Sequence, residues 1–187
     1  MKPRQPNPLF RAFANWCIRR AMRTPYFHVR HEDGTPYMDR FWLFRWGGSR
    51  EIGQEPSVHP WIALNVHHIR SSDWSTYHDH PWGFFTLILR GRYTEVTPQP
   101  FIGVPLGFGG YTRYRTYRAG SLRFVRARQW HYLTLEPGED AWTLVLKLPK
   151  VQTWGFLVNG IKVPWREYLK QRAELMVDRP AVRQRDL

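Results

Sequence analysis

The stretch His78-Asp79-His80-Pro81-Trp82, taken with Gln129-Trp130-His131 later in the chain, decides the fold. Side chains alternate in direction along a strand, so His78 and His80 are expected to point to the same face. His131, on a distant strand, can then complete a facial set of three imidazole nitrogens. Iron, zinc, copper, nickel and manganese all accept imidazole ligands, so the pattern predicts a divalent metal without deciding which one.

Length and composition limit the class of protein. The chain of 187 residues has the size of one domain with an extra arm, and its 42% of hydrophobic residues suffice for a packed core. A single cysteine, Cys17, excludes an internal disulfide framework and a thiolate cluster, which favours a reducing compartment. We find no signal peptide and no apolar run of membrane-spanning length, so we expect a cytoplasmic protein without a membrane partner.

The basic charge indicates an anionic partner. Lysine and arginine number 28 against 15 acidic residues, which gives a net charge of +13. Most of this excess is arginine, whose planar guanidinium binds phosphates and carboxylates bidentately. We favour a small anionic substrate. Nucleic acid stays open as a partner, and so does the view that the arginines lie on solvated faces.

The pattern of apolar residues predicts helices only at the two ends of the chain. Asn7 and Pro8 are a typical cap and first residue for a helix over 8–23, and a second helix is expected over 164–176. Between them, short segments separated by glycine and proline predict a β-sandwich or barrel. Strands are expected at 26–30, 38–44, 61–69, 82–96, 111–118, 122–135, 141–148 and 153–158. The segment 82–96 can be one strand or two strands divided at Gly91.

Three segments follow from this pattern: a basic amphipathic arm (1–24), a barrel with its C-terminal helix (25–176) and a charged tail (177–187). The strands at 122–135 and 141–148 are expected to pair as a hairpin, and a loop rich in proline and glycine is expected at 98–110. A homodimer that covers the N-terminal helix is a further expectation.

The histidine motifs resemble those of the cupin superfamily, whose fold is a double-stranded β-helix, or jelly-roll barrel. The first cupin motif is matched by His78, His80 and Gly91, with Phe84 or Phe85 where the family has glutamate. The second motif is matched by Gly120 and His131, with Arg126 and Arg128 at the usual proline and glycine positions. The resemblance implies an all-β jelly-roll barrel in which His78, His80 and His131 bind a metal. The missing glutamate implies an open coordination face.

A longer pattern resembles a narrower cupin-like family of bacteria and tailed phages. It runs from His68 through Asp73 to the His-Asp-His-Pro-Trp stretch and on to Leu89-x-Gly91-x-Tyr93-x-Glu95. That family tends to end in a Trp-Gly-Phe strand and a Trp-Arg-Glu segment, which here lie at 154–156 and 165–167. It is distantly similar to cysteine dioxygenase, which binds Fe(II) with three histidines, and this similarity implies O2 activation.

Acidic and histidine side chains near the expected ligands are candidates for second roles. Ligating imidazoles usually donate their other N–H to a carboxylate, for which Asp73 and Glu95 are within reach, whereas Asp79 is expected to point outward. Glu95 can also serve as ligand or base. His68, if it points inward, is the candidate acid or base, and His67 is expected to be exposed.

Substrate contacts are predicted from strand parity. Arg126 and Arg128 share one face and are candidates to hold an anionic substrate near the mouth of the barrel, with Trp82 and Tyr93 completing the set.

The residues and the resemblance together favour a non-haem Fe(II), dioxygenase-like enzyme acting on a small anionic substrate, with zinc, nickel or manganese as the other metals in play. Two alternatives stay open. One is a non-catalytic cupin module of a virion or a nucleic-acid complex. The other is a metal-independent sugar-nucleotide epimerase or isomerase.

Overall fold

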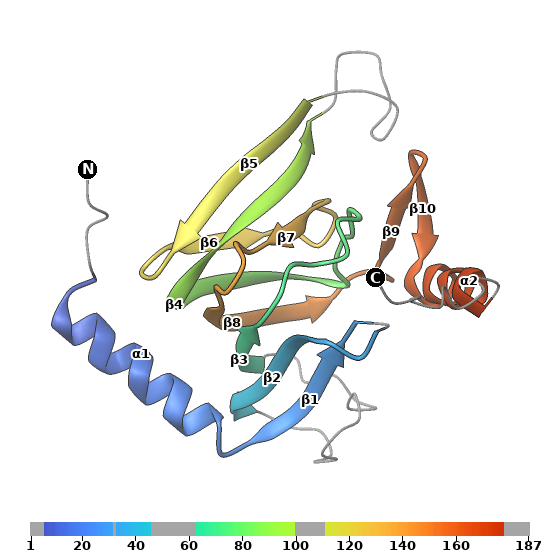
Figure 1. Ribbon diagram of the computed structural model, residues 1–187. Coiled ribbons are helices and arrows are strands. Elements are labelled where there is room, and N and C mark those ends of the chain that lie inside the picture. The colour runs from blue at the N-terminus through green and yellow to red at the C-terminus, as the bar shows by residue number, and fades with distance from the viewer. Residues whose placement is uncertain (1–5, 32, 46–62, 100–110, 178–187) are drawn as a thin grey trace, which may run out of the picture.

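The structure is a computed structural model that describes residues 6–31, 33–45, 63–99 and 111–177 (Figure 1). The two helices within these ranges lie at the ends of the chain, α1 (Pro8–Ala21) and α2 (Trp165–Val177). The strands between them are β1 (Pro25–Arg30), β2 (Pro36–Arg45), β3 (Ala63–Ile69), β4 (Trp82–Gln99), β5 (Tyr111–Arg118), β6 (Leu122–Val125), β7 (Tyr132–Thr134), β8 (Ala141–Lys150), β9 (Gly155–Val158) and β10 (Ile161–Pro164).

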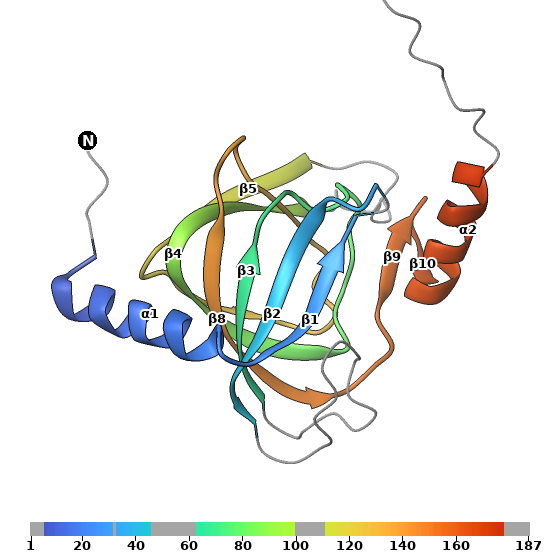
Figure 2. The ribbon, with the colours of Figure 1, turned by 60° about the horizontal axis from the view of Figure 1, so that its bottom comes forward.

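The long strand β4 belongs to both sheets of the barrel. Its first half pairs with β8 and β6 and completes a sheet in the order β1-β2-β3-β8-β4. Its second half pairs with β5 and β7. Figure 2 shows β4 curving from one sheet into the other, so that the strands enclose an interior. This arrangement confirms the predicted all-β jelly-roll barrel.

Gly91 lies where β4 passes between the sheets. Its φ is +75°, and a Cβ atom there would lie 1.9 Å from the carbonyl oxygen of Asp140. No other residue type avoids both the strained dihedral and the clash. The sequence left open whether Gly91 divides the segment into two strands. The structure contains one strand that bends there, with a register shift against β8 at Ile88 and Arg90.

Helix α1 packs on the outer face of the larger sheet. Asn7 caps it as expected, since its Oδ1 accepts from the backbone N–H of Phe10 at 2.7 Å. Its buried residues, Ala14, Cys17, Ile18 and Ala21, form one apolar cluster with Phe41, Val66, Leu89 and Trp142 of the sheet. The first turns extend past the edge of the barrel (Figures 1 and 2). There Leu9, Phe13 and Trp16 form an exposed apolar stripe.

The C-terminal strands and helix lie on the other side of the barrel from α1 (Figure 2). Asp79 joins them to the barrel, because its buried carboxylate accepts from the backbone N–H of Gly155 at 2.8 Å and from Lys162 Nζ at 2.5 Å. Gln152 Nε2 donates to the same carboxylate at 2.8 Å. Asp79 thus points away from His78 and His80, as expected, but it is buried beneath β9 rather than solvated.

Two expectations about strand pairing and loops need revision. The segment 122–135 is not one strand: β6 and β7 are separated by residues 126–131, and both pair with β4 rather than with β8. The predicted hairpin across Glu136–Asp140 is therefore absent from the described ladders. Most of the 98–110 loop and of the 177–187 tail lies outside the described residues. Neither α1 nor α2 combines the length and apolarity needed to cross a membrane.

Candidate metal centre

Three histidines converge inside the barrel. The candidate ligand atoms of His78, His80 and His131 all lie within 4.8 Å of one another. The shortest approach joins the Nε2 atoms of His80 and His131, 2.7 Å apart. His131 is 3% exposed, and the other two are half-buried. The structure thus brings together the three histidines that the sequence singled out.

Backbone hydrogen bonds fix these histidines relative to one another. His78 and His131 face each other in an isolated bridge, in which each backbone N–H donates to the carbonyl of the other at 2.9 and 3.0 Å. The N–H of His80 donates to the carbonyl of Ala127 at 2.9 Å. The segment that carries His78 and His80 is therefore extended and alternating, although it is not part of a regular strand.

Carboxylates lie behind two of the three rings. Glu95 Oε1 is 2.5 Å from Nδ1 of His131, and Asp73 Oδ2 is 3.2 Å from Nδ1 of His78. The first contact is a hydrogen bond. The second is close, but its angles do not satisfy hydrogen-bond geometry, so both atoms are buried without a hydrogen-bond partner in the described part of the chain. A carboxylate on Nδ1 sets the tautomer and leaves Nε2 as the coordinating atom, which is the usual arrangement around metal-bound histidine.

Glu95 is itself held in a buried ion pair. Arg123 donates to the same oxygen that faces His131, and Gln129 Nε2 approaches it at 3.5 Å. Glu95 is 3% exposed. Glu95, which the sequence suggested as ligand or base, contacts His131 and is not among the described residues that line the cavity.

Burial disfavours the charged form of two of the three imidazoles, His80 and His131. It lowers the pKa of His80 well below the ordinary value, and the neighbouring His131 and His78 lower it further. The pKa of His131 is likewise lowered, by burial first and then by His78 and Arg123. Neutral imidazole is the form that binds a metal, so the lowered pKa values of His80 and His131 favour metal binding at these two residues.

The donor set fits a divalent metal. If Nδ1 of His131 carries the proton that faces Glu95, Nε2 of His131 can only accept a hydrogen bond. The 2.7 Å contact between the two Nε2 atoms of His80 and His131 then requires that His80 carry its proton on Nε2. A cation between these rings would replace that proton, with His80 changing tautomer. Three imidazole nitrogens without a thiolate suit Fe(II), Zn(II), Ni(II) or Mn(II), and the geometry alone does not choose among them.

The three histidines open onto a cavity of about 90 Å³. At roughly 10–15 Å³ for each water-sized group, it has room for only a small ligand. Apolar side chains form most of the wall, including Met38, Ile69, Phe84 and Val145. Trp82 and Tyr93, predicted as substrate contacts, both lie in this wall.

His68 lies outside the cavity. Its Nε2 is 2.7 Å from Asp140 Oδ2, and its ring stacks on Trp142 with centroids 4.0 Å apart. Its neighbour His67 lines the cavity instead. The expected directions of these two histidines are therefore reversed. Both faces of β3 are covered, the outer one by α1 over Val66, so apolar alternation does not tell inside from outside.

Arg126 and Arg128 also lie away from the cavity. They share one direction, as predicted, but both are exposed on the outside of the barrel, in line with Phe124. The inward positions of this segment are Arg123, Val125 and Ala127, which are buried. The basic side chains in the wall are Arg40, Arg123 and Lys147, which the sequence analysis did not assign to the site. The strand register identifies Arg40 as a wall residue, because Arg40 pairs directly with His67 in the sheet.

Comparison with known proteins gives similarity at the level of the fold. No family model matches the chain, and no curated protein matches it. Solved cupin-fold structures do. The polyketide cyclase RemF from Streptomyces resistomycificus is 16% identical with a TM-score of 0.46, covering 71% of this chain and 78% of that one.

Two further structures are similar over a smaller share of their length. The DMSP lyase DddQ from Ruegeria pomeroyi DSS-3 is 17% identical with a TM-score of 0.44, over 67% of this chain and 54% of that one. Fe(II)-HppE with the alternative substrate (S)-1-HPP is 11% identical with a TM-score of 0.43, over 65% and 55%. The chain thus spans about half the length of these two proteins.

Proposed function

We propose that this protein is a metal-dependent oxidoreductase that holds Fe(II) on His78, His80 and His131 and acts with O2 on a small anionic substrate. The observation that carries the proposal is the convergence of three imidazoles on one cavity, with carboxylates at Nδ1 of two of them. Iron is preferred over zinc, nickel and manganese because the sequence pattern resembles that of a three-histidine dioxygenase.

The bound metal would supply a redox-active Lewis acid that orients and activates both reactants. The protein's own groups do the rest. Glu95 holds the ring of His131, and Arg123 neutralises the buried carboxylate. Tyr93 keeps its proton at neutral pH, because burial raises its pKa to about 12, and it therefore offers a donor at the cavity wall.

Nitric oxide, an analogue of O2, tests this proposal without knowledge of the substrate. Protein loaded anaerobically with Fe(II) should give the high-spin iron–nitrosyl EPR signal, and His80→Ala should not. Oxygen uptake in the presence of short carboxylates is then the activity assay. An iron-loaded protein that gives no nitrosyl signal would lack the open coordination position on which the proposal depends.

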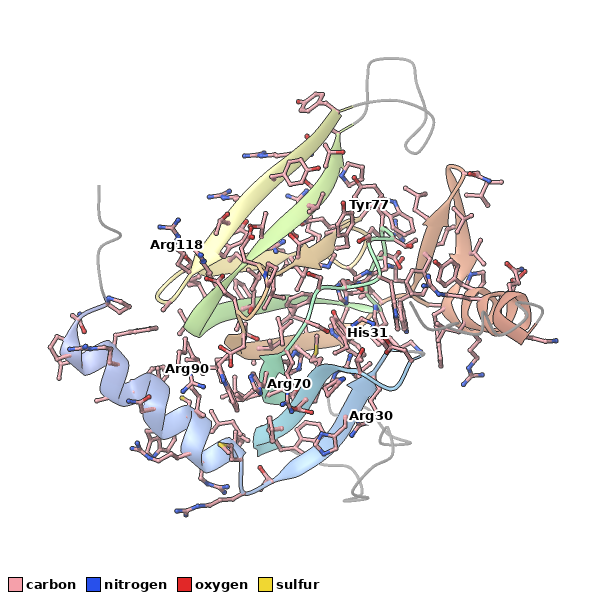
Figure 3. All side chains as sticks on the ribbon, viewed as in Figure 1. Arg30, His31, Arg70, Tyr77, Arg90 and Arg118 are labelled. Carbon is pink, nitrogen blue, oxygen red and sulfur yellow. The ribbon has the colours of Figure 1, made fainter. Side chains whose placement is uncertain are left out.

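One observation favours a second candidate, a polyanion-binding module. Arg113, Arg115, Arg126 and Arg128 are exposed and form no salt bridge within the described residues, in keeping with the net charge of +13. The exposed Arg30, Arg70, Arg90 and Arg118, however, are spread over several strands rather than gathered into one patch (Figure 3). Binding to a nucleic acid that weakens steeply with salt in the metal-free protein would favour this candidate.

A further inference from the structure

We propose that the inner wall around His67 is an oxyanion subsite, which binds the carboxylate of a small substrate beside the metal centre. This inference rests on the proposed function and deepens it, because it names the charged group of the substrate and the side chains that recognise it. It also replaces Arg126 and Arg128, which face away from the cavity.

The wall is a row of polar side chains on three neighbouring strands. In the sheet register, His67 of β3 pairs with Arg40 of β2 on one side and with Thr143 of β8 on the other. Side chains directly opposite in a sheet share a face, and all three residues line the cavity. Lys147 of β8 lines the same cavity. A guanidinium, an imidazole, a hydroxyl and an ammonium group are thus presented to one small space.

His67 provides the decisive observation. Its Nε2 is buried and has no hydrogen-bond partner among the residues that the structure describes. A buried polar atom without a partner costs folding free energy, and native proteins rarely retain one without a ligand or a water to satisfy it. His67 is not one of the three clustered metal-ligand candidates, so its open nitrogen calls for a different occupant.

The chemistry of the wall selects an anion. No carboxylate belongs to the cavity lining among the described residues, since Asp73 and Glu95 lie behind the ligand histidines. Burial lowers the pKa of His67 well below its ordinary value, and Arg40 and Lys147 lower it further, so the ring is neutral and these cations are its neighbours. A neutral Nε2–H donates to a carboxylate oxygen without adding a buried charge.

The position relative to the metal centre suits a short carboxylate. His67 and the three clustered histidines line one cavity of about 90 Å³. A substrate of a few heavy atoms can then place its carboxylate at His67 and its other end at the three histidines.

Acetate is the probe that tests the subsite, with acetamide as its uncharged analogue. Calorimetric titrations would use metal-free and zinc-loaded protein in a buffer free of phosphate and sulfate. We expect acetate to bind both forms, acetamide to fail to compete, and His67→Leu to weaken acetate about tenfold or more. His68→Leu is the matched control, because its side chain lies outside the cavity, and it should leave acetate binding unchanged.

Thr143→Val provides a second variant of nearly the same shape, and it should weaken acetate several-fold even where His67→Leu fails to fold. The subsite is refuted if the parent binds no acetate, if acetamide binds equally well, or if His67→Leu and Thr143→Val retain the parent affinity. It is also refuted if His67→Leu abolishes zinc binding, since His67 would then be a ligand. A parent that binds acetate but no metal would retain the subsite and refute the proposed function instead.

Discussion

Replacing Glu95 by glutamine separates the support of the metal centre from the ligands themselves. The variant keeps the shape of the side chain but removes the charge that faces Nδ1 of His131 at 2.5 Å. Loss of a carboxylate behind a ligand histidine typically weakens metal binding 10–100-fold, which corresponds to about 1.4–2.8 kcal/mol. Metal affinity should therefore fall by this amount, with no change in the number of ligands.

The same substitution leaves Arg123 without its partner. The side chains of Arg123 and Glu95 are 7% and 4% exposed, and breaking a buried ion pair costs about 3–5 kcal/mol. Glutamine still offers a carbonyl oxygen to Arg123. We therefore expect urea unfolding to show a free energy of unfolding lower by about 3 kcal/mol, the lower end of this range. The double variant Glu95→Gln/Arg123→Met should regain part of this stability without regaining metal affinity.

Cobalt titration, followed by visible absorption, is the assay for affinity. Glu139→Gln is the matched control: Glu139 also pairs with an arginine, Arg92, but on the surface, and its loss should leave cobalt binding unchanged. If folded Glu95→Gln binds cobalt with the parent's affinity, the carboxylate of Glu95 does not support His131 in the metal complex, and this proposed role of Glu95 is refuted.

Three further predictions concern pH, the C-terminal hairpin and assembly. Because the pKa values of His67, His80 and His131 are lowered in the folded state, the unfolded chain binds more protons below pH 6.5. The free energy of unfolding of the metal-free protein should thus fall by up to about 1.4 kcal/mol per histidine for each pH unit below 6.5. The raised pKa of Glu95 has the opposite effect on this free energy. Urea unfolding with a chelator at pH 7.5 and 5.5 measures this, and equal stability at both values would contradict it. Asp79→Asn should destabilise the fold by about 2–3 kcal/mol, because the buried carboxylate accepts three hydrogen bonds, and it should expose β9 to proteolysis; an unchanged cleavage pattern would argue against this link. The expected homodimer would bury the apolar stripe of α1, so light scattering should show a dimer that Trp16→Glu converts to monomer, and a monomeric parent would end that prediction.

The sequence predicts the fold class and the three ligands because these depend on local signals. Each of these signals spans only a few residues: Gly91, the glycines and prolines between the strands, and each of the two histidine motifs. The pairing of β6 and β7 was not predictable in the same way, because it depends on where β4 bends between the sheets. A hairpin between consecutive strands was the simpler expectation.

The side chains of the cavity wall could not be assigned from parity alone. Alternation distinguishes the faces of a strand only when one face is polar, and α1 makes the outer face of β3 as apolar as the inner one. As a result, His67 faces the cavity and His68 lies outside it, the reverse of the prediction. Phe124 of β6 is exposed and shares its face with Arg126 and Arg128, so an apolar residue on that face did not indicate the core. The buried Arg123 on the opposite face was therefore left unassigned.

The most direct test of the metal centre is the metal content of untagged protein after anaerobic incubation with Fe(II) and removal of excess metal. We predict close to one iron per chain in the parent, and loss of that iron in each of His78→Ala, His80→Ala and His131→Ala with the fold retained. Stoichiometric iron in these variants, or none in the folded parent, would contradict the three-histidine centre.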